Sequence, residues 1–515
     1  MKRDFDAIVI GSGLGGLVAG ALYARAGHRV LILERNDSFG GAATVYRHGA
    51  LSIEASLHEM DGLDDDDSKL PLFRSLGLDR DLQFVTPDDL YEVRGAIIGE
   101  PFALPHGGDA ALSAAVTRFP RHQAGLKEFF ARVNAARVAV SFLSHHQDDG
   151  GVWWLTHAPE AVRRLWPLIR EGRATVGEVM QELFGVDEAV KAALAANLGY
   201  YDDDPDRMLF LRYAMAQGSF TKGGGHYVRG GSQALSDRLV TLVREANGVA
   251  EAGREADAIF IEGDSVVGVG HRASGGGDQR IDHAPVVFGN ASPHVLATML
   301  PDAKRADFLT PYTERKLSIS LWSLSIGLSR PPREFGVTHF STFIFPAWMK
   351  QFSKYREGAA IMGEEPGARL PLYCFVDFDR IDSGLGNRDG LFLGQLVGMD
   401  RVENWDGLSV DVERARKERW MDRLIGDLDR EFPGIAGAIT RRELSTAKTM
   451  RHYLNTPGGA VYGFAPDALA FKPRTTIGGL WLASSFTGAG GFTGAMLGGA
   501  MAAREAIKLA KSSKG

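Results

Sequence analysis

The segment from Asp6 to Glu34 restricts the fold more strongly than any other part of the chain. The apolar stretch 6–10 predicts a strand, the motif GSGLGG follows at 11–16, and the small residues of 17–26 predict a helix. Residues 28–33 predict a second strand, which ends at the acidic Glu34. This order of strand, glycine loop, helix, strand and acid predicts a βαβ unit that binds a dinucleotide.

Each glycine of this motif, and the acidic residue after it, has a physical role. Gly11 permits the tight turn, Gly13 allows a pyrophosphate to approach the backbone, and Gly16 allows the helix to pack closely on the strand. Glu34 follows Gly16 by 18 residues and is the predicted acceptor for the ribose hydroxyls. The alternative is an ordinary βαβ unit whose glycines serve packing alone, and the complete order of elements favours the dinucleotide site.

Composition excludes several classes of protein. The 515 residues carry a net charge of -6 with no basic stripe, which argues against nucleic-acid binding. The single cysteine, Cys374, excludes a disulfide framework and a thiolate metal site, and no metal site is predicted from the histidines. The start MKRDFDAIVI leads directly into a strand without the features of a secretion signal, so we expect a cytoplasmic protein.

A long uncharged stretch lies near the end of the chain, between Arg474 and Arg504. Its repeated Gly, Ser and Thr residues disfavour a membrane span. Residues 480–483 predict a buried strand, 487–491 a glycine turn and 493–508 a helix. Such a strand, turn and helix N-terminus predict an anion site or a close backbone approach to a planar ligand.

A second glycine pair narrows the identity of the dinucleotide. Gly40 and Gly41 follow the acidic strand end and the basic Arg35 in the run ERNDSFGG. At this point the chain resembles the two-dinucleotide-binding flavoproteins, whose basic residue and glycine pair lie along the cofactor. The resemblance implies FAD as the cofactor, with Arg35, Gly40 and Gly41 beside it.

Four further blocks are similar to one branch of these flavoproteins. They are YVRGGSQALSDRL at 227–239, the paired stretches 256–259 and 266–269, VVFGNASP at 286–293, and PGGAVYG at 457–463. Together they resemble the family of phytoene desaturases, carotenoid isomerases and retinol saturases. The resemblance implies an α/β fold with a discontinuous Rossmann-like FAD domain and a substrate domain made of a mixed sheet with a helical cap.

The same resemblance implies the division of the chain and the rest of the cofactor site. The FAD domain is expected from residues 1–75, 225–300 and 440–515, and the substrate domain from 76–224 and 301–439. Ala256 lies in the block that returns to the FAD domain. The glycine-rich C-terminal turn is expected to meet FAD through Ser485, Gly490, Gly491, Phe492 and Gly494.

The catalytic acid or base is only weakly specified. The stretch Ile53–His58 occupies the position where the family has an Asp, a Gly and often a His before the flavin. Glu54 and Ser56 depart from that pattern, so substrate fit near the ring is expected to differ. His58 and Glu54 are the catalytic candidates, and the alternative for His58 is a structural hydrogen-bonding role. Arg451, His452 and Tyr462 are lesser candidates.

The resemblance implies an FAD-dependent oxidoreductase that exchanges hydride with flavin N5 at C=C or C–H positions of a lipophilic polyene or isoprenoid. Desaturation, saturation and cis/trans isomerisation remain open. The chain shows no second GxGxxG unit, so electrons are expected from the substrate or from a diffusible partner.

Two other functions remain open. One is an amine-oxidase-like flavoenzyme, although Tyr462 and Trp481 are poorly spaced for the aromatic cage of that class. The other is a lipid-escort protein that resembles the dissociation inhibitors of prenylated GTPases and lacks flavin chemistry. Glu34 and the intact glycines argue against the escort protein.

Three predictions concern the substrate domain. Residues 317–329 predict a strand with a bulge at Trp322-Ser323, where the apolar residues change face, and 411–432 predict an amphipathic helix. A lipophilic substrate implies peripheral contact with the inner face of the membrane, for which the best candidate is the segment 152–169 with Trp153, Trp154 and Trp166. The alternative is that these tryptophans are buried beneath the cap.

Overall fold

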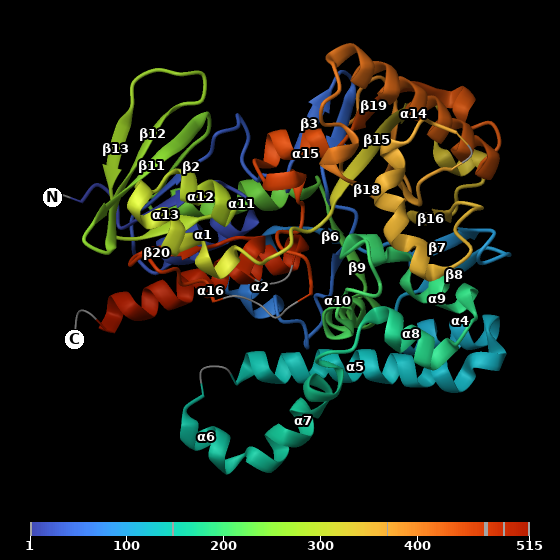
Figure 1. Ribbon diagram of the computed structural model, residues 1–515, viewed down its shortest axis with the longest axis horizontal. Helices are drawn as coiled ribbons and strands as arrows, with labels where there is room; N and C mark the ends of the chain where they lie inside the picture. The colour runs from blue at the N-terminus through green and yellow to red at the C-terminus, as the bar shows by residue number, and fades with distance from the viewer. Residues whose placement is uncertain (1–2, 147–148, 368, 468–471, 488–489, 513–515) are drawn as a thin grey trace.

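The βαβ unit predicted at the start of the chain forms the centre of a five-stranded parallel sheet (Figure 1). The computed structural model describes residues 3–146, 149–367, 369–467, 472–487 and 490–512. The strand order is β10 (Val249–Glu251), β2 (Val30–Leu33), β1 (Ala7–Ile10), β14 (Val287–Gly289) and β20 (Leu480–Leu482). Segments from both ends and the middle of the chain share this sheet, which confirms the discontinuous Rossmann-like fold.

The central strands are buried on both faces. Along β1, Ala7 and Val9 pack into one hydrophobic cluster, and Ile8 and Ile10 pack into another on the opposite side of the sheet. Consecutive strand residues point to opposite faces, so an uninterrupted apolar run is what a parallel sheet between two layers requires. A three-stranded antiparallel sheet lies beside it, formed by β11 (Arg254–Glu262), β12 (Ser265–Ala273) and β13 (Arg280–His283).

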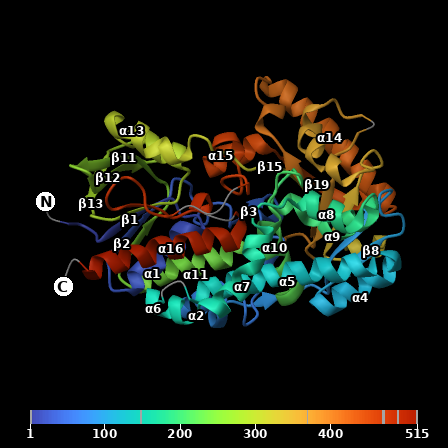
Figure 2. The same ribbon diagram turned by 60° about the horizontal axis from the view of Figure 1, so that its bottom comes forward.

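Helices from the two ends of the chain pack against each other through glycines. Helix α1 (Leu14–Arg25) follows β1, α16 (Gly491–Ser512) follows β20, and Figures 1 and 2 show them side by side. A Cβ on Gly499 would lie 2.0 Å from the carbonyl oxygen of Gly15, and one on Gly15 would lie 2.4 Å from that of Ala483. The predicted C-terminal strand and helix are therefore present, and their glycines allow this approach.

A seven-stranded mixed sheet forms the second layer of the molecule. Its order is β19 (Ile439–Ser445), β15 (Ser320–Leu328), β18 (Phe392–Asp400), β17 (Tyr373–Asp377), β16 (Ser341–Phe345), β7 (Asp89–Gly95) and β8 (Phe102–Pro105). The pairing of β16 with β7 is parallel and the other pairings are antiparallel. The domain division remains a prediction, but its boundary at residue 440 falls inside β19, which belongs to this sheet.

The predicted bulge at Trp322-Ser323 is wrong. Strand β15 pairs with β18 without interruption, and its single register shift, against β19, lies between Gly327 and Leu328. Trp322 and Leu324 share one face of β15 and pack into the cluster beneath α14 (Val410–Glu431), while Leu321 points to the opposite face and lines an internal cavity. Both faces of β15 are buried, so an apolar residue on either face needs no change of register.

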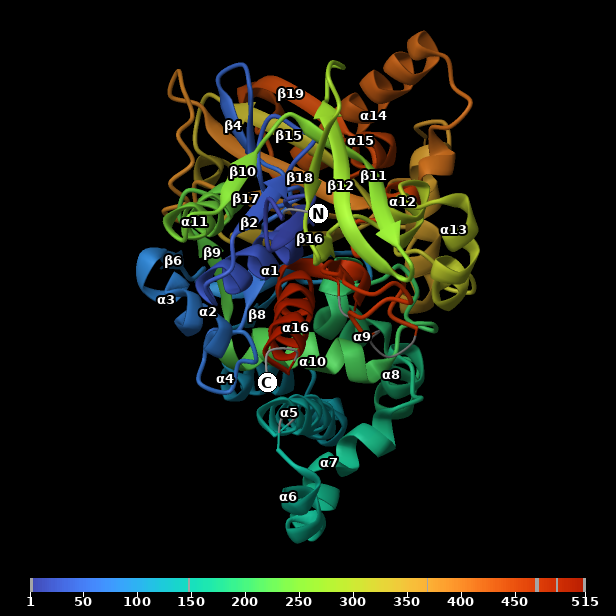
Figure 3. The same cartoon turned by 90° about the vertical axis from the view of Figure 1, so that its left-hand side faces the viewer.

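A helical cap covers the other face of the sheet. It comprises α4 (Gly108–Arg118), α5 (Gln123–His145), α7 (Ala158–Glu171), α8 (Val176–Phe184), α9 (Glu188–Ala195) and α10 (Phe210–Gly223). Figures 1 and 3 show α7 and the short α6 (Gly151–Thr156) projecting furthest from the sheets. No helix within the described ranges is long and apolar enough to cross a membrane.

The remaining elements connect these layers. They are the hairpin of β3 (Val45–His48) and β4 (Leu51–Glu54), the small sheet of β5 (Met60–Asp61), β9 (Gly225–Val228) and β6 (Phe84–Val85), and the helices α2 (Leu70–Leu76), α3 (Leu78–Asp81), α11 (Ser232–Glu245), α12 (Pro293–Thr298), α13 (Asp302–Leu309) and α15 (Ala447–Leu454).

The contact between α1 and α16 can be tested with one added methyl group. Gly499→Ala is expected to destabilise the protein by about 1–3 kcal/mol, because the methyl group has no space beside Gly15. The matched control is Gly426→Ala on the exposed face of α14, where an added Cβ meets nothing within 4 Å. The control should gain roughly 0.5–1 kcal/mol from helix propensity. Equal melting temperatures for the two variants would contradict the tight helix contact.

Candidate functional site

The glycine loop between β1 and α1 has the shape that a dinucleotide site requires. Gly11 has a φ of +88°, which L side chains rarely adopt. A Cβ on Gly13 would lie 2.4 Å from Oδ1 of Asn290, and one on Gly16 would lie 2.5 Å from the carbonyl oxygen of Gly11. The loop therefore bends sharply, and α1 begins close against the end of β1 with no side-chain cap on its N-terminus.

The second glycine pair lies directly against this loop. Gly40 forms an isolated parallel bridge with Gly13, and its N–H donates to both the carbonyl and the hydroxyl oxygen of Ser12, each at 3.1 Å. A Cβ on Gly41 would lie 3.2 Å from Cα of Gly13. Residues 11–16 and 40–41 consequently form one glycine-lined wall, although they are separated in the sequence.

Glu34 is buried beneath that wall. Its Oε2 accepts hydrogen bonds from the Ser12 N–H at 2.9 Å and from the Ser12 hydroxyl at 2.6 Å, and its Oε1 accepts from the Asn36 N–H at 2.8 Å. The carboxylate is thus held at the glycine loop. Arg35 points elsewhere, because its guanidinium donates to the carbonyl of His452 at the end of α15.

Two other predicted cofactor residues flank this region. Ala256 lies in β11, which begins where the Arg254 N–H donates to the carbonyl of Glu34 at 2.7 Å. Ser485 follows β20, and its backbone packs so closely on Gly463 that a Cβ there would lie 2.7 Å from the Ser485 carbonyl oxygen. Neither residue lines the internal cavity described next.

An internal cavity of about 710 Å³ lies between the seven-stranded sheet, the cap and the start of α16. The sheet contributes Leu321, Phe343, Cys374, Val397 and Met399, and α10 contributes Leu211 and Met215. Clefts of this size with mainly apolar walls and few polar groups are typical sites for small lipophilic molecules.

The glycine-rich start of α16 forms part of the cavity wall. Gly490, Gly491, Phe492 and Gly494 all line it, and their contact with FAD stays a prediction. A Cβ on Gly490 would lie 2.4 Å from Cβ of Tyr462, whereas one on Gly491 would meet nothing within 4 Å. Since the rest of α16 packs on α1, this helix connects the cavity with the glycine loop.

Three polar groups stand in a row on the cavity wall. Nδ1 of His58 lies 3.1 Å from the Tyr200 hydroxyl, which lies 3.8 Å from Sγ of Cys374. Burial lowers the pKa of His58 to about 4, raises the pKa of Cys374 to about 12 and raises the pKa of Tyr200 above its usual range. All three side chains are consequently neutral near pH 7, and the single hydroxyl proton of Tyr200 serves one neighbour at a time.

Glu59 is a carboxyl group on the same cavity wall. Burial and the nearby carboxylate of Asp89 raise its pKa well above the usual value, and the Ser341 hydroxyl lies 3.4 Å from Oε1. A Cβ on Gly225 would lie 1.9 Å from Oε2, so this glycine leaves room for the carboxyl group. Glu59 therefore retains a proton at a higher pH than an exposed carboxyl group does.

Glu54, the other catalytic candidate, does not line the cavity. Its Oε2 accepts from the Ser232 N–H at 2.8 Å, and its Oε1 accepts from the Ser232 hydroxyl at 2.6 Å and from the Leu57 N–H at 3.1 Å. These bonds join β4 to the first residue of α11 and occupy both oxygens. The geometry favours a structural role for Glu54 over the predicted catalytic one.

The lesser catalytic candidates and the two rings considered for an aromatic cage lie in different places. Tyr462 lines the cavity, whereas Trp481 is buried in β20 and does not, so the two rings do not form an aromatic cage. Arg451 forms an ion pair with Asp406 at 2.7 Å, outside the cavity.

Sequence reasoning missed Tyr200, Cys374 and Glu59. Glu59 adjoins His58, but the direction of its side chain depends on the path of residues 54–61 in the folded protein. Tyr200 and Cys374 come from the cap and from β17, and nothing in the sequence links the two. A lone cysteine in an apolar strand was the available signal, and by itself it indicates core packing.

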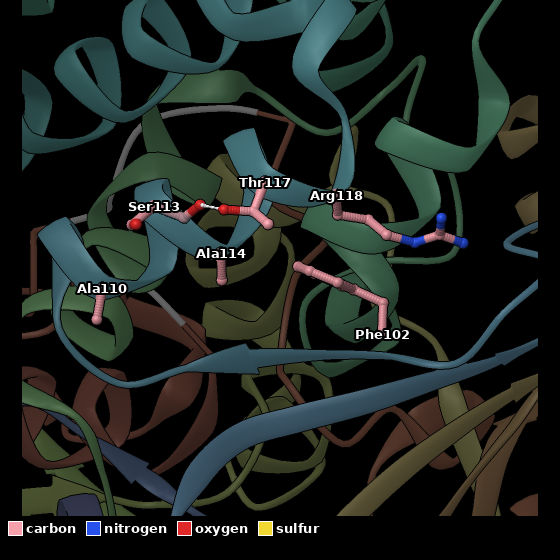
Figure 4. Close-up of a pocket in the computed structure, with 6 residues that line it drawn as sticks. All are labelled: Phe102, Ala110, Ser113, Ala114, Thr117 and Arg118. Carbon is pink, nitrogen blue, oxygen red and sulfur yellow. Dashed lines mark hydrogen bonds between the residues drawn. The ribbon is translucent and has the colours of Figure 1, made fainter.

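A shallow surface depression lies away from these groups, between β8 and α4 (Figure 4). Six residues line it: Phe102, Ala110, Ser113, Ala114, Thr117 and Arg118. Arg118 donates to the carbonyls of Ile98 and Glu100, and the Thr117 hydroxyl donates to the Ser113 carbonyl at 2.8 Å. Among the residues described, no carboxylate, histidine or cysteine lines this depression.

Comparison with known proteins finds a matching family model for the N-terminal βαβ unit and relatives for nearly the whole chain. The profile of the NAD(P)-binding Rossmann-like domain matches residues 9–76. The chain is similar along nearly its whole length to all-trans-retinol 13,14-reductase of Danio rerio, with 22% identity over 97% of this chain and 85% of the relative.

Two further relatives carry other activities in their names. Phytoene desaturase (neurosporene-forming) of Rhodobacter capsulatus is 24% identical over 93% of this chain and 90% of its own. Chloroplastic prolycopene isomerase of Daucus carota is 24% identical over 93% of this chain and 74% of its own.

Solved structures share the fold. An oxidoreductase from Methanosarcina mazei superposes with a TM-score of 0.63 at 14% identity, covering 98% of this chain and 99% of the other. Putrescine oxidase bound to putrescine superposes with a TM-score of 0.60 at 14% identity, covering 98% and 99%. At such identities these likenesses support the fold alone.

The burial of His58 predicts a dependence of stability on pH. An unfolded histidine has a pKa of about 6.5 and gains a proton as the pH falls below it, whereas buried His58 stays neutral down to about pH 4. Unfolding is therefore favoured as the pH falls from 6.5 to 4. Between pH 7 and pH 5 the wild type should lose about 2 kcal/mol more stability than His58→Gln.

Urea unfolding of both proteins at the two pH values measures this difference. His157→Gln, at an exposed position in the cap, is the matched control and should follow the wild type. Parallel pH dependence of wild type and His58→Gln would show that His58 is not held neutral.

Proposed function

Because the chain belongs to the family of phytoene desaturases, carotenoid isomerases and retinol saturases, we propose that it is an FAD-dependent oxidoreductase acting on a lipophilic polyene or isoprenoid. The observation that carries the proposal is the continuity of one helix, α16. Its first turn lines the apolar cavity, and its later turns pack on the helix of the dinucleotide fingerprint. A cofactor held at that fingerprint would meet a substrate held in that cavity.

The residues present fit FAD. Gly11, Gly13 and the pair Gly40–Gly41 provide a backbone wall against which a pyrophosphate fits, beside the uncapped N-terminus of α1. Glu34 is buried at this wall and suits the ribose hydroxyls. The open space at Gly491 suits the flavin end, since a side chain there would point into an unfilled region. When bound, FAD would supply hydride exchange through N5 of its ring at C=C or C–H positions.

The chain's own groups orient the substrate and handle protons. The apolar walls hold an extended hydrocarbon and exclude water. Tyr200 is protonated near pH 7, and Glu59 keeps its proton to a higher pH than an exposed carboxyl group does, so both suit donation to the substrate. Neutral His58 suits proton acceptance. The same arrangement serves desaturation, saturation and isomerisation, which differ in the net transfer of electrons.

The projecting helices α6 and α7 support peripheral contact with a membrane. Val152 and Leu155 on α6 and Trp166 and Ile169 on α7 are 76%, 79%, 57% and 67% exposed, respectively. Arginines 163, 164, 170 and 173 accompany them, which suits anionic head groups. The predicted contact changes in one detail, because Trp153 and Trp154 are half-buried and pack on each other with ring centroids 5.1 Å apart.

The cofactor and the reaction are tested together by spectroscopy. The purified protein should carry flavin absorbance or regain it with added FAD, and anaerobic mixing with all-trans-retinol or phytoene should change that absorbance or isomerise the polyene. Glu34→Ala should weaken FAD binding by about 1–3 kcal/mol, because the ribose hydroxyls lose their acceptor.

The control for this test is Glu262→Ala, which removes an exposed carboxylate at the end of β11. It should retain flavin after dialysis as well as the wild type. A protein that binds lipid but never FAD would contradict the proposal and favour the escort function. Equal retention of flavin by Glu34→Ala would remove Glu34 from the site.

Membrane contact is tested by co-sedimentation with anionic vesicles. Leu155→Ser/Trp166→Ser should reduce binding severalfold, because it removes apolar surface from the projecting helices. Val186→Ser/Val410→Ser removes two apolar residues elsewhere that are on average more exposed, at 90% and 73%, and this variant should bind as the wild type does. Absence of wild-type binding would contradict membrane contact, and equal loss in both variants would assign it to another surface.

A further inference from the structure

Arg137 on α5 is a buried cation on the wall of the cavity. Its side chain is 4% exposed, and it lines the cavity together with Val140. Its Nη2 donates to both carboxylate oxygens of Asp64, at 2.5 and 2.6 Å. Its Nε and Nη1 are also buried, and neither has a hydrogen-bond partner within the part of the chain that the structure describes.

Helix α10 holds this arginine in place. A Cβ on Gly218 would lie 3.1 Å from Cβ and 3.3 Å from Cδ of Arg137, so the arginine stem packs on the bare backbone of α10. A Cβ on Gly223 would lie 2.3 Å from Oδ2 of Asp64, so the carboxylate rests on the same helix one and a half turns later. Helices α10 and α5 pack against each other, and Figure 1 shows α10 directly above α5. The guanidinium therefore has no path to solvent on this side.

A second buried arginine on the same helix has hydrogen-bond acceptors for its Nε, Nη1 and Nη2 groups. Arg132 is buried to a similar degree, at 5% side-chain exposure, but its Nε, Nη1 and Nη2 all donate to Glu171 or Glu182. Arg132 does not line the cavity. Of these two arginines, the one that faces the cavity has the unpaired N–H groups, and buried donors without an acceptor are costly.

The charges around Arg137 restrict the ligand. Asp64 already compensates the guanidinium, and the cavity wall also carries Asp61, Asp66 and the cation Arg212. A carboxylate or phosphate bound at the free N–H groups of Arg137 would be repelled by the Asp64 carboxylate on the same guanidinium. A hydroxyl or carbonyl oxygen accepts the free N–H groups without adding charge, and the apolar side chains of Leu143, Leu168 and Met215 on the same wall suit the adjoining hydrocarbon.

We propose that Arg137 binds a neutral oxygen, a hydroxyl or a carbonyl, at one end of the polyene or isoprenoid in the cavity. The substrate is then an oxygenated lipid rather than a pure hydrocarbon. This inference rests on the proposed function, since it assumes that the cavity holds such a lipid. Arg137 would set which end of the molecule reaches the helical wall and hence which bonds reach the start of α16.

Binding of two matched probes tests the inference without turnover. All-trans-retinol carries the hydroxyl group, and axerophtene has the same polyene with a methyl group in place of the hydroxymethyl group. Quenching of protein fluorescence gives a dissociation constant for each. The wild type should bind retinol at least tenfold more tightly than axerophtene, and Arg137→Lys should lose about tenfold in retinol affinity with less than a twofold change for axerophtene.

Lysine retains the ion pair with Asp64 but has no Nε or Nη1, so this variant isolates the free donors. Arg132→Lys is the control on the same helix and should leave the preference for retinol unchanged. If Arg137→Lys fails to fold, Arg137→Gln/Asp64→Asn removes both charges and should show the same selective loss of retinol binding.

Each other outcome contradicts a different statement. Equal binding of both probes by the wild type, or equal loss of both in Arg137→Lys, overturns the inference and leaves the proposed function intact. Tighter binding of all-trans-retinoic acid than of retinol, with the same dependence on Arg137, overturns the neutral oxygen in favour of a carboxylate. Binding of neither polyene to a flavin-loaded protein overturns the proposed function together with the inference.

Discussion

The backbone contact between α1 and α16 is the constraint on which the rest of the structure depends. Gly15 and Gly499 come from opposite ends of the chain and meet without side chains between them. Only at this separation can β20 complete the parallel sheet beside β14 while the first turn of α16 faces the cavity. Steric exclusion of a single Cβ thus couples the dinucleotide fold to the wall of the substrate site.

Burial determines the chemistry of the cavity more than charge pairing does. His58, Tyr200, Cys374 and Glu59 come from different segments, yet desolvation favours the neutral form of each. An apolar polyene fits these four groups because neutral side chains lose little hydration when it enters. The cavity wall also carries charged side chains, among them Arg137, whose charge is balanced by Asp64 before any ligand arrives.

The helical cap lies between the cavity and the outer surface of the protein. Helix α5 carries Arg137, α10 supplies the glycines that seat it, and α7 contributes Leu168 to the cavity while exposing Trp166 and Ile169 to solvent. One helix therefore faces both the interior and the outer surface. The proposed membrane contact would place this helix between the bilayer and the cavity.

The cofactor roles of Glu34 and Gly490–Gly494 stay predictions, and residues 488–489 of the predicted glycine turn lie outside the described residues. Local sequence was sufficient for the βαβ unit, for β20 and for α16. Their patterns depend on neighbours in the chain, through strand and helix periodicity and the freedom of glycine. The roles of residues 53–59 could not be predicted from the sequence. They depend on the path of the chain after β4, which directs Glu54 to the first residue of α11 and His58 and Glu59 to the cavity. The positions of Tyr200, Cys374 and Arg137 on the cavity wall also could not be predicted from the sequence. Their burial and their hydrogen-bond partners depend on segments that are distant in the chain and meet only in the folded protein.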